Sequence, residues 1–326
     1  MAEPIGTPGA APETQALARF QLRTARTPSL WTGLLETARR SVWWLLADFA
    51  LMALAWQMGA TSTVFVGAAA ALAPFVVTAW GWRRVGYHRQ MLRAWAVGDW
   101  PAVRQLAAQL QKGGPPSVLL QFDLDVRLAS IDAREGKLAE GLRRIAPWPA
   151  KLADKPGLFE SRAATVYSAG GDMQSFVQTM GQAYEQSKHD PSRGVDYALA
   201  LARFGDVDQA SALIESIDAT LLPPNACSFV DWVRGLVQAR RGQPEALNTL
   251  GAAVSGFLQR ADQPAVWTSL AFAAADHALA LKCAGYAAQA QIANVWPVLK
   301  PHADAALLQT LQAEGLMPAA SNDSKA

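Results

Sequence analysis

The side chains that could do chemistry in this 326-residue chain do not form a familiar catalytic pattern. The four histidines are scattered along the sequence, at His88, His189, His277 and His302. We expect each to be a surface or half-buried residue and not a catalytic base. The chain has no GxSxG, P-loop, GxGxxG or HExxH motif, so hydrolytic, nucleotide and zinc chemistry lack their usual residues. We therefore predict no enzymatic activity, no cofactor, no metal site and no small-molecule substrate.

Charge and cysteine usage narrow the possible partners further. The formal net charge is only +2, which is too balanced for the broad basic face that nucleic-acid binding requires. Cys227 and Cys283 lie in separate apolar stretches, without CxxC spacing or a nearby pair of histidines. They are predicted to be buried free thiols, because cysteine often serves as a small core residue.

Two adjacent apolar runs, residues 41–58 and 63–82, are each near the length that a helix needs to cross hydrocarbon. Arginines precede the first run and follow the second, whereas the loop at 59–62 carries no charge, so both flanks are expected to be cytoplasmic. Tryptophans lie near the ends of the runs, where aromatic residues of membrane proteins often lie at the interface between lipid and water. This pattern predicts a transmembrane hairpin in a bacterial inner membrane, with both termini cytoplasmic. A buried hairpin of a soluble protein is the alternative.

Asp48 is the only charged residue inside either run. A carboxylate at that depth is unfavourable unless it is protonated, paired or directed at a partner helix. Asp48 is therefore interpreted either as an intramembrane assembly contact or as a neutral acid that is hydrogen-bonded within the hairpin.

The rest of the chain carries an internal repeat, because glycines that close helix-like stretches recur at intervals mostly in the thirties. They are Gly98, Gly136, Gly171, Gly205, Gly242 and Gly285. A small residue stands seven positions before each of the last five, at Ala129, Ala164, Ala198, Gly235 and Ala278. Aspartates that can cap the next helix follow three of the glycines, at Asp99, Asp172 and Asp206. The period predicts stacked pairs of helices.

Residues 164–172 and 198–206 resemble the first helix and turn of tetratricopeptide repeats, with Tyr167 on the aromatic position of that family. Ala210 matches the small residue of the second helix, whereas Met91 and Phe176 depart from the pattern in their units. The resemblance covers about residues 86–315. It implies an all-α fold in which a transmembrane helical hairpin is followed by an α-solenoid, similar to tetratricopeptide repeats, of about six helical pairs. The expected organisation is a flexible tail (1–30), the hairpin (31–85), the repeat array (86–316) and a disordered tail (317–326).

In such arrays the first helices line a concave groove that suits an extended peptide or a partner helix. The family's groove-facing positions fall on Arg127, Ser130, Arg162, Thr165, Asp196 and Trp232. Arg127 and Arg162 could hold an acidic segment of a partner, or they could simply be solvated. The lysine and asparagine set of repeats that bind chaperone tails is missing.

The order of parts, two spans followed by repeats, is similar to that of HemY-type membrane proteins associated with haem biosynthesis, and residues 92–95 and 98–100 resemble the start of their first repeat. The favoured interpretation is a membrane-anchored scaffold that binds a protein partner and contacts the lipid bilayer. Two alternatives are a regulatory subunit of an inner-membrane enzyme or transporter, and a soluble repeat adaptor.

Overall fold

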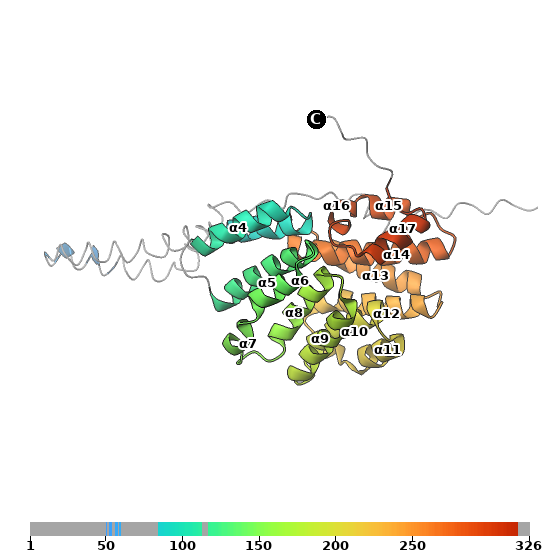
Figure 1. Cartoon of the computed structure of the whole chain (residues 1–326), viewed down its shortest axis with the longest axis horizontal. Coiled ribbons are helices and arrows are strands. Elements are labelled where there is room, and N and C mark those ends of the chain that lie inside the picture. Colours follow the sequence, from blue (N-terminus) through green and yellow to red (C-terminus); the bar gives the residue numbers. More distant parts are fainter. Residues whose placement is uncertain are drawn as a thin grey trace, which may run out of the picture. The chain divides into compact units, whose positions relative to one another are not determined.

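A computed structural model describes residues 50, 52–53, 56–57, 59, 84–112 and 117–318, and all secondary structure in these residues is helical (Figure 1). The all-α prediction is thus confirmed for the described part of the chain. A helix over 84–96 is followed by these elements: α4 (Trp100–Lys112), α5 (Val118–Arg134), α6 (Leu138–Ile145), α7 (Trp148–Lys151), α8 (Leu158–Ala169), α9 (Met173–Gln186), α10 (Pro191–Phe204), α11 (Val207–Ser216), η1 (Ala219–Leu221), η2 (Pro224–Ala226), α12 (Cys227–Arg240), α13 (Ala246–Leu258), η3 (Pro264–Val266), α14 (Trp267–Cys283), α15 (Gln289–Ala293), α16 (Trp296–Leu299) and α17 (Ala305–Ala313).

Most of the predicted transmembrane hairpin, including Asp48, lies outside the described residues, as do the tails at 1–30 and 319–326. Within the described ranges, no helix combines the length and the apolar character that crossing a bilayer requires. The hairpin and the role of Asp48 therefore stay predictions.

The chain divides into two compact units. In the smaller unit, the described residues are 84–93, most of α4 and a few positions between 50 and 59. Val103, Ala107 and Leu110 of α4 are buried and follow one another at helical spacing, so they form one apolar stripe. Met91, which stands where the repeat pattern expects a small residue, is also fully buried.

The larger unit consists of consecutive helical pairs. The most extensive contacts join α12 to α13, α5 to α6, α8 to α9 and α13 to α14, and α10 packs almost equally on α11 and α9. The first helix of one pair then packs on the next pair, as α5 does on α8 and α10 on α12, and second helices such as α9, α11 and α13 contact the helix that follows them. Figure 1 shows these helices following one another in chain order. Packing between successive pairs is compatible with a solenoid of helices.

The repeated glycines and small residues have the structural roles that the sequence indicates. Each of the six glycines comes directly after a helix or within two residues of its end. Five of them have positive φ angles, the left-handed conformation that favours glycine, and only Gly205 does not (φ −126°). The small residues lie where helices cross: Ala129, Ala164, Ala198 and Ala278 are fully buried, and a Cβ on Gly235 would meet Leu250 at 2.7 Å.

Aspartates cap the N-termini of two of the second helices, α9 and α11. The carboxylate of Asp172 accepts a hydrogen bond from the backbone N–H of Ser175, and that of Asp206 accepts from Asp208 and Gln209. These bonds satisfy backbone donors that have no partner in the first turn of a helix. Helix capping by these two residues is therefore confirmed.

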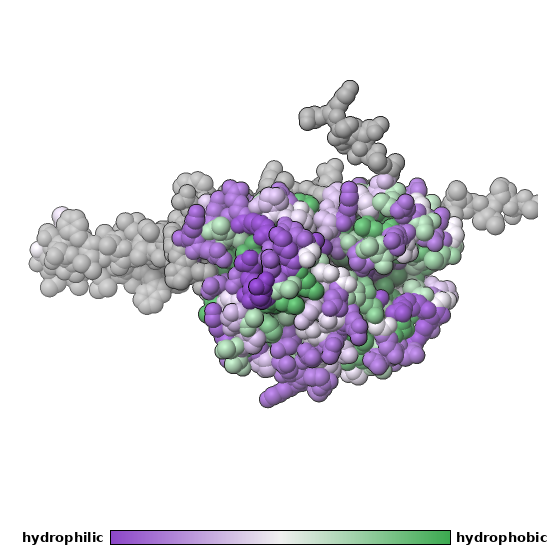
Figure 2. All heavy atoms as spheres, in the orientation of Figure 1, coloured by the Kyte–Doolittle hydropathy of each residue, from purple (hydrophilic) through white to green (hydrophobic). Residues whose placement is uncertain are grey.

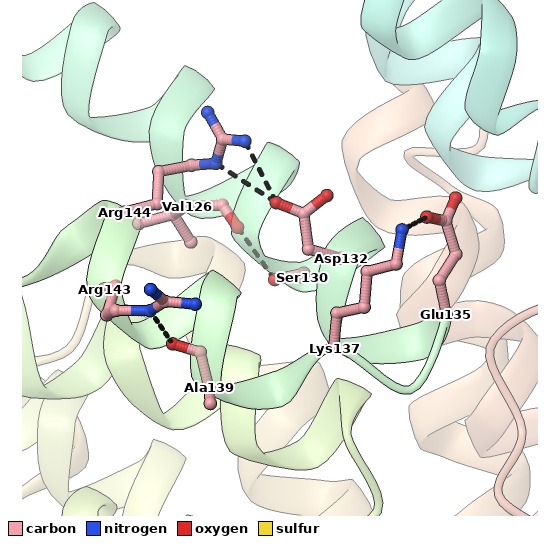
Figure 3. A network of polar contacts seen from close by, with 8 residues as sticks. All are labelled: Val126, Ser130, Asp132, Glu135, Lys137, Ala139, Arg143 and Arg144. Carbon is pink, nitrogen blue, oxygen red and sulfur yellow. Dashed lines mark hydrogen bonds and ion pairs between the residues drawn. The ribbon is translucent and has the colours of Figure 1, made fainter.

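The pair α5–α6 shows how close the helical contact is. A Cβ on Gly141 would lie 2.5 Å from the carbonyl oxygen of Ala129. Polar contacts hold the same pair: Arg144 donates from Nε and an Nη to the buried carboxylate of Asp132, at 3.2 and 3.0 Å (Figure 3). Lys137 and Glu135 form an exposed ion pair beside the turn that joins the two helices (Figure 3).

Replacing Gly141 with alanine is expected to lower the free energy of unfolding by about 1–3 kcal/mol, because the new methyl group overlaps backbone that cannot yield without separating α5 from α6. Urea unfolding followed by far-UV circular dichroism measures the change. The matched control is Ala139→Ser on the exposed side of the same helix, which should stay within about 0.5 kcal/mol. Unchanged stability of the Gly141→Ala variant would show that the two helices do not cross this closely.

In the larger unit, residues near the C-terminal end, Pro301 and His302, contact residues near its N-terminal end. The ring of His302 donates from Nε2 to the carbonyl oxygen of Trp95 (2.9 Å), and Arg134 donates to the carbonyl oxygen of Pro301 (3.0 Å). Gly98, at φ +73°, packs so closely on Pro301 that a Cβ would overlap its ring. Residues far apart in the sequence thus close the unit, which contacts between successive pairs alone would not do.

The prediction that the cysteines are buried is wrong. Both are free thiols, and both are exposed. Cys227 is the first residue of α12 and Cys283 is the last residue of α14, so each lies at a helix end, outside the stretch in which neighbouring helices cover the apolar side chains.

Candidate functional site

A cavity of about 800 Å³ opens among the helices of the larger unit. Its walls come from the end of α5, from α8, α9, α10, α12 and α14, and from residues 302–305, which return from the end of the unit. In the space-filling view, hydrophobic residues are exposed among hydrophilic ones in the middle of the face shown (Figure 2). The volume lies within the range of binding pockets for small molecules or peptide side chains.

Arginine dominates the charge of this cavity. Four arginines line it, Arg134, Arg162, Arg193 and Arg203, against two aspartates, Asp196 and Asp304. No lysine or glutamate belongs to the described lining. The cavity therefore favours an anionic ligand, and guanidinium groups bind carboxylates in a planar, two-pronged geometry.

Arg162 is the most accessible of the four arginines. It lies on the exposed face of α8, and no hydrogen bond or ion pair of its side chain is found with the described residues. Its neighbour one turn on, Thr165, also lines the cavity and donates its hydroxyl to the backbone oxygen of Arg162 (2.7 Å). The guanidinium of Arg162 is thus available to a ligand.

Arg193 and Asp196 form an ion pair across one turn of α10, at 3.6 Å. Burial raises the pKa of the Asp196 carboxyl, while the charges of Arg193 and Arg162 act in the opposite direction. Because Asp196 partly neutralises Arg193, this side of the cavity offers less net positive charge than its count of arginines suggests.

Arg203 is held inside an aromatic cluster. Its guanidinium lies 4.5 Å from the ring centroid of Phe272, 5.5 Å from that of Phe204 and 5.7 Å from that of Trp232. Asp276 lies behind it, at 3.6 Å from Arg203, and accepts a hydrogen bond from Trp232 Nε1 at 2.8 Å. The side chains of Arg203 and Asp276 are only 12% and 9% exposed. Burial raises the pKa of Asp276, whereas Arg203 and the Trp232 hydrogen bond favour its charged form.

Arg134 is the second arginine of the lining for which no carboxylate partner is found in the described part of the chain. Its Nη atoms donate to the carbonyl oxygen of Pro301 (3.0 Å) and to Nδ1 of His302 (3.4 Å), and its guanidinium lies over the ring of Trp100. The buried Nε has no hydrogen-bond partner among the described residues. Burial lowers the pKa of Arg134 to about 10, so the side chain stays charged at neutral pH.

His302 completes the contacts of Arg134. Its Nε2 must carry a hydrogen because it donates to the carbonyl oxygen of Trp95, which leaves Nδ1 as the acceptor for Arg134. Burial and the neighbouring Arg134 lower the pKa of His302 to about 4. The imidazole is therefore neutral at physiological pH.

The structure brings four of the six predicted groove residues together: Arg162, Thr165, Asp196 and Trp232 all line the cavity. Trp232 is nevertheless 97% covered, and its N–H is engaged by Asp276. Arg127 and Ser130 are not part of the lining. Arg127 pairs with Asp123 at 2.8 Å and lies over the ring of Trp95, while the hydroxyl of Ser130 is buried and donates to the backbone oxygen of Val126 (Figure 3).

Sequence reasoning missed the arginines at the ends of two first helices. Arg134 lies two turns after Arg127 on α5, and Arg203 lies two turns after Asp196 on α10. Residues seven positions apart share one face of a helix, so extending the predicted groove face by two turns would have found both. The prediction that each histidine lies at the surface or is half-buried is wrong for His277 and His302, because both are buried.

Within the described ranges, no group of three or more histidine, cysteine, aspartate or glutamate side chains is arranged to hold a metal ion. Comparisons of the chain with protein-family models, with curated proteins and with solved structures find no match. Function is therefore inferred from the residues of the cavity.

Proposed function

We propose that this protein is a membrane-anchored scaffold that binds a protein partner in the cavity of its helical repeats. The single observation that carries the proposal is the cavity itself, which is lined by side chains from successive first helices, α5, α8, α10, α12 and α14. Concave surfaces of stacked helical pairs are suited to an extended chain, because each pair contributes one set of contacts along the length of the ligand.

The helical pairs are proposed to be tetratricopeptide-like repeats. The support is the close crossing of the two helices of a pair at small residues, such as Gly141 on Ala129, and the left-handed glycines that end the first helices. Asp172 and Asp206, which cap the second helices, fit the same repeat.

The anchor is proposed to be the hairpin of the apolar runs at 41–58 and 63–82. Its support is the asymmetry of charge, with arginines outside the two runs and an uncharged loop between them. With both flanks cytoplasmic, the repeats face the cell interior.

A photo-crosslinking side chain at position 165 tests partner binding in native membranes. Thr165 is exposed and lines the cavity, so the variant should form a covalent adduct with a defined protein. The matched control carries the same side chain at Glu140, an exposed residue of α6 that is not part of the cavity. Equal crosslinking from both positions, or none from position 165, would contradict the proposal. Release of the chain from membranes by a high-salt wash would contradict the anchor.

A further inference from the structure

We infer that the ligand of the cavity is an acidic segment of a polypeptide that places a carboxylate on Arg162 and an aromatic or aliphatic side chain against Phe204 and Phe272. The inference rests on the proposed function, since it specifies the chemistry of the partner that the cavity would hold. Three features of the cavity lead to it: its free cations, its apolar wall and its hydroxyl groups.

By free cations we mean the arginines of the lining that have no carboxylate partner among the described residues, Arg162 and Arg134. The other two arginines of the lining already have carboxylates, because Arg193 pairs with Asp196 and Arg203 with Asp276. Arg162 is exposed and has no ion pair with the described residues, and Arg134 is mostly buried with a free Nε. A buried cation without a counter-charge is unfavourable, so an anion that entered the cavity would be bound strongly there. One carboxylate on Arg162 and a second acidic group towards Arg134 would balance both.

The apolar wall is formed by aromatic side chains of α10, α12 and α14. Phe204 and Phe229 are partly accessible, and both line the cavity together with Phe272. Phe204 is 37% exposed, so part of its apolar surface is accessible to a ligand. Phe176 of α9 contacts it edge to face, with ring centroids 5.8 Å apart, and the guanidinium of Arg203 lies 5.5 Å from its ring centroid. An apolar side chain of a ligand would cover the part of Phe204 that these contacts leave exposed.

Hydroxyl groups also line the cavity. Thr165 and Ser168 of α8, and Thr268 and Ser269 of α14, belong to the lining. They can donate to or accept from the backbone of an extended peptide, which has both kinds of group at every residue. A small inorganic anion would use Arg162 or Arg134 but would leave the aromatic wall and the hydroxyl groups without a partner.

Selection of peptides on the full chain tests the inference. Random heptapeptides displayed on phage are selected against the purified full-length protein held in lipid nanodiscs. The expected result is enrichment of sequences that carry aspartate or glutamate near an aromatic or large aliphatic residue. Arg162→Glu should weaken the binding of a selected peptide at least tenfold, and exchange of its acidic residue for lysine should restore binding to that variant.

The matched control is Arg143→Glu, which makes the same charge change at an exposed position of α6 outside the cavity and should leave the affinity unchanged. Arg134→Gln is a second variant, and it should weaken peptides with two acidic residues more than peptides with one. A folded far-UV circular dichroism spectrum of each variant shows that loss of binding is not loss of structure.

Three outcomes would overturn the inference. The first is enrichment of neutral or basic peptides that still crosslink at position 165, which leaves the proposed function standing and removes only the acidic ligand. The second is affinity for acidic peptides that Arg162→Glu does not change. The third is tight binding of inorganic phosphate or of an oligouridylate that displaces the peptides. Failure of the proposed function itself is recognised separately, by the absence of any protein adduct at position 165 in native membranes.

Discussion

Replacement of Asp276 by alanine is expected to lower the free energy of unfolding by about 3–5 kcal/mol, the usual loss when one member of a buried ion pair is removed. Asp276 is the only carboxylate found within 4 Å of Arg203 among the described residues, and both side chains are largely covered. The substitution leaves a buried guanidinium without a counter-charge and the N–H of Trp232 without its acceptor. Urea unfolding of the purified protein, followed by far-UV circular dichroism, measures the loss.

The control for this prediction is Asp276→Asn, which keeps a side-chain oxygen for Trp232 but removes the negative charge. Its stability should fall between that of the wild type and that of the alanine variant. Asp208→Ala is a second control, because Asp208 pairs with Arg241 at 2.7 Å but is 87% exposed. Exposed pairs contribute about 0–1 kcal/mol, so this variant should be nearly as stable as the wild type. A small loss in Asp276→Ala would mean that Arg203 reaches water or another acceptor when the carboxylate is absent.

The second large effect is a loss of stability in mild acid caused by His302. Its pKa is about 4 in the folded protein, against an ordinary value of 6.5. As the pH falls below 6.5, the unfolded chain takes up a proton on this histidine before the folded chain does, so the folded state is progressively disfavoured down to pH 4. The difference amounts to roughly 3 kcal/mol at the acidic end, and above pH 6.5 the residue makes no such contribution.

His302→Gln keeps a donor for the carbonyl oxygen of Trp95 and cannot be protonated. We expect the difference in unfolding free energy between this variant and the wild type to change by roughly 3 kcal/mol between pH 7 and pH 4, in the direction that favours the variant in acid. The control is His189→Gln, which makes the same substitution at an exposed histidine outside the cavity. Comparing variants with the wild type removes the contributions of carboxylates that titrate in the same range. Parallel pH profiles of His302→Gln and wild type would show that His302 is not shielded from water.

The repeated features of the fold follow from local physical chemistry, and for that reason they could be predicted. A glycine that ends a helix in the left-handed conformation, such as Gly171, needs only its own backbone freedom. An aspartate such as Asp172 caps the helix that begins beside it. The period of small residues reflects contacts between helices that are neighbours in the chain, so the signal repeats with each pair.

The cavity could be predicted only in part. Arg162, Thr165 and Asp196 lie on it because the helical face of a first helix is set by spacing along the sequence. Arg127 was misplaced because its charge is neutralised by Asp123 one turn away and its side chain lies on Trp95. Trp95 lies outside the helical pair that contains Arg127, so the contact between them could not be predicted from the repeat pattern of the sequence.

The sequence by itself determined that the described part of this protein is helical, where its helices end, and which small residues stand where the helices cross. Only the tertiary structure decided that Pro301 and His302 return to Trp95 and Arg134, that Asp276 neutralises Arg203, and that both cysteines are exposed. The physical reason is the separation of the interacting residues along the chain. Helix ends depend on residues a few positions apart. The contacts of Pro301 and His302 and the pairing of Arg203 with Asp276 depend on residues that folding brings together from distant parts of the chain.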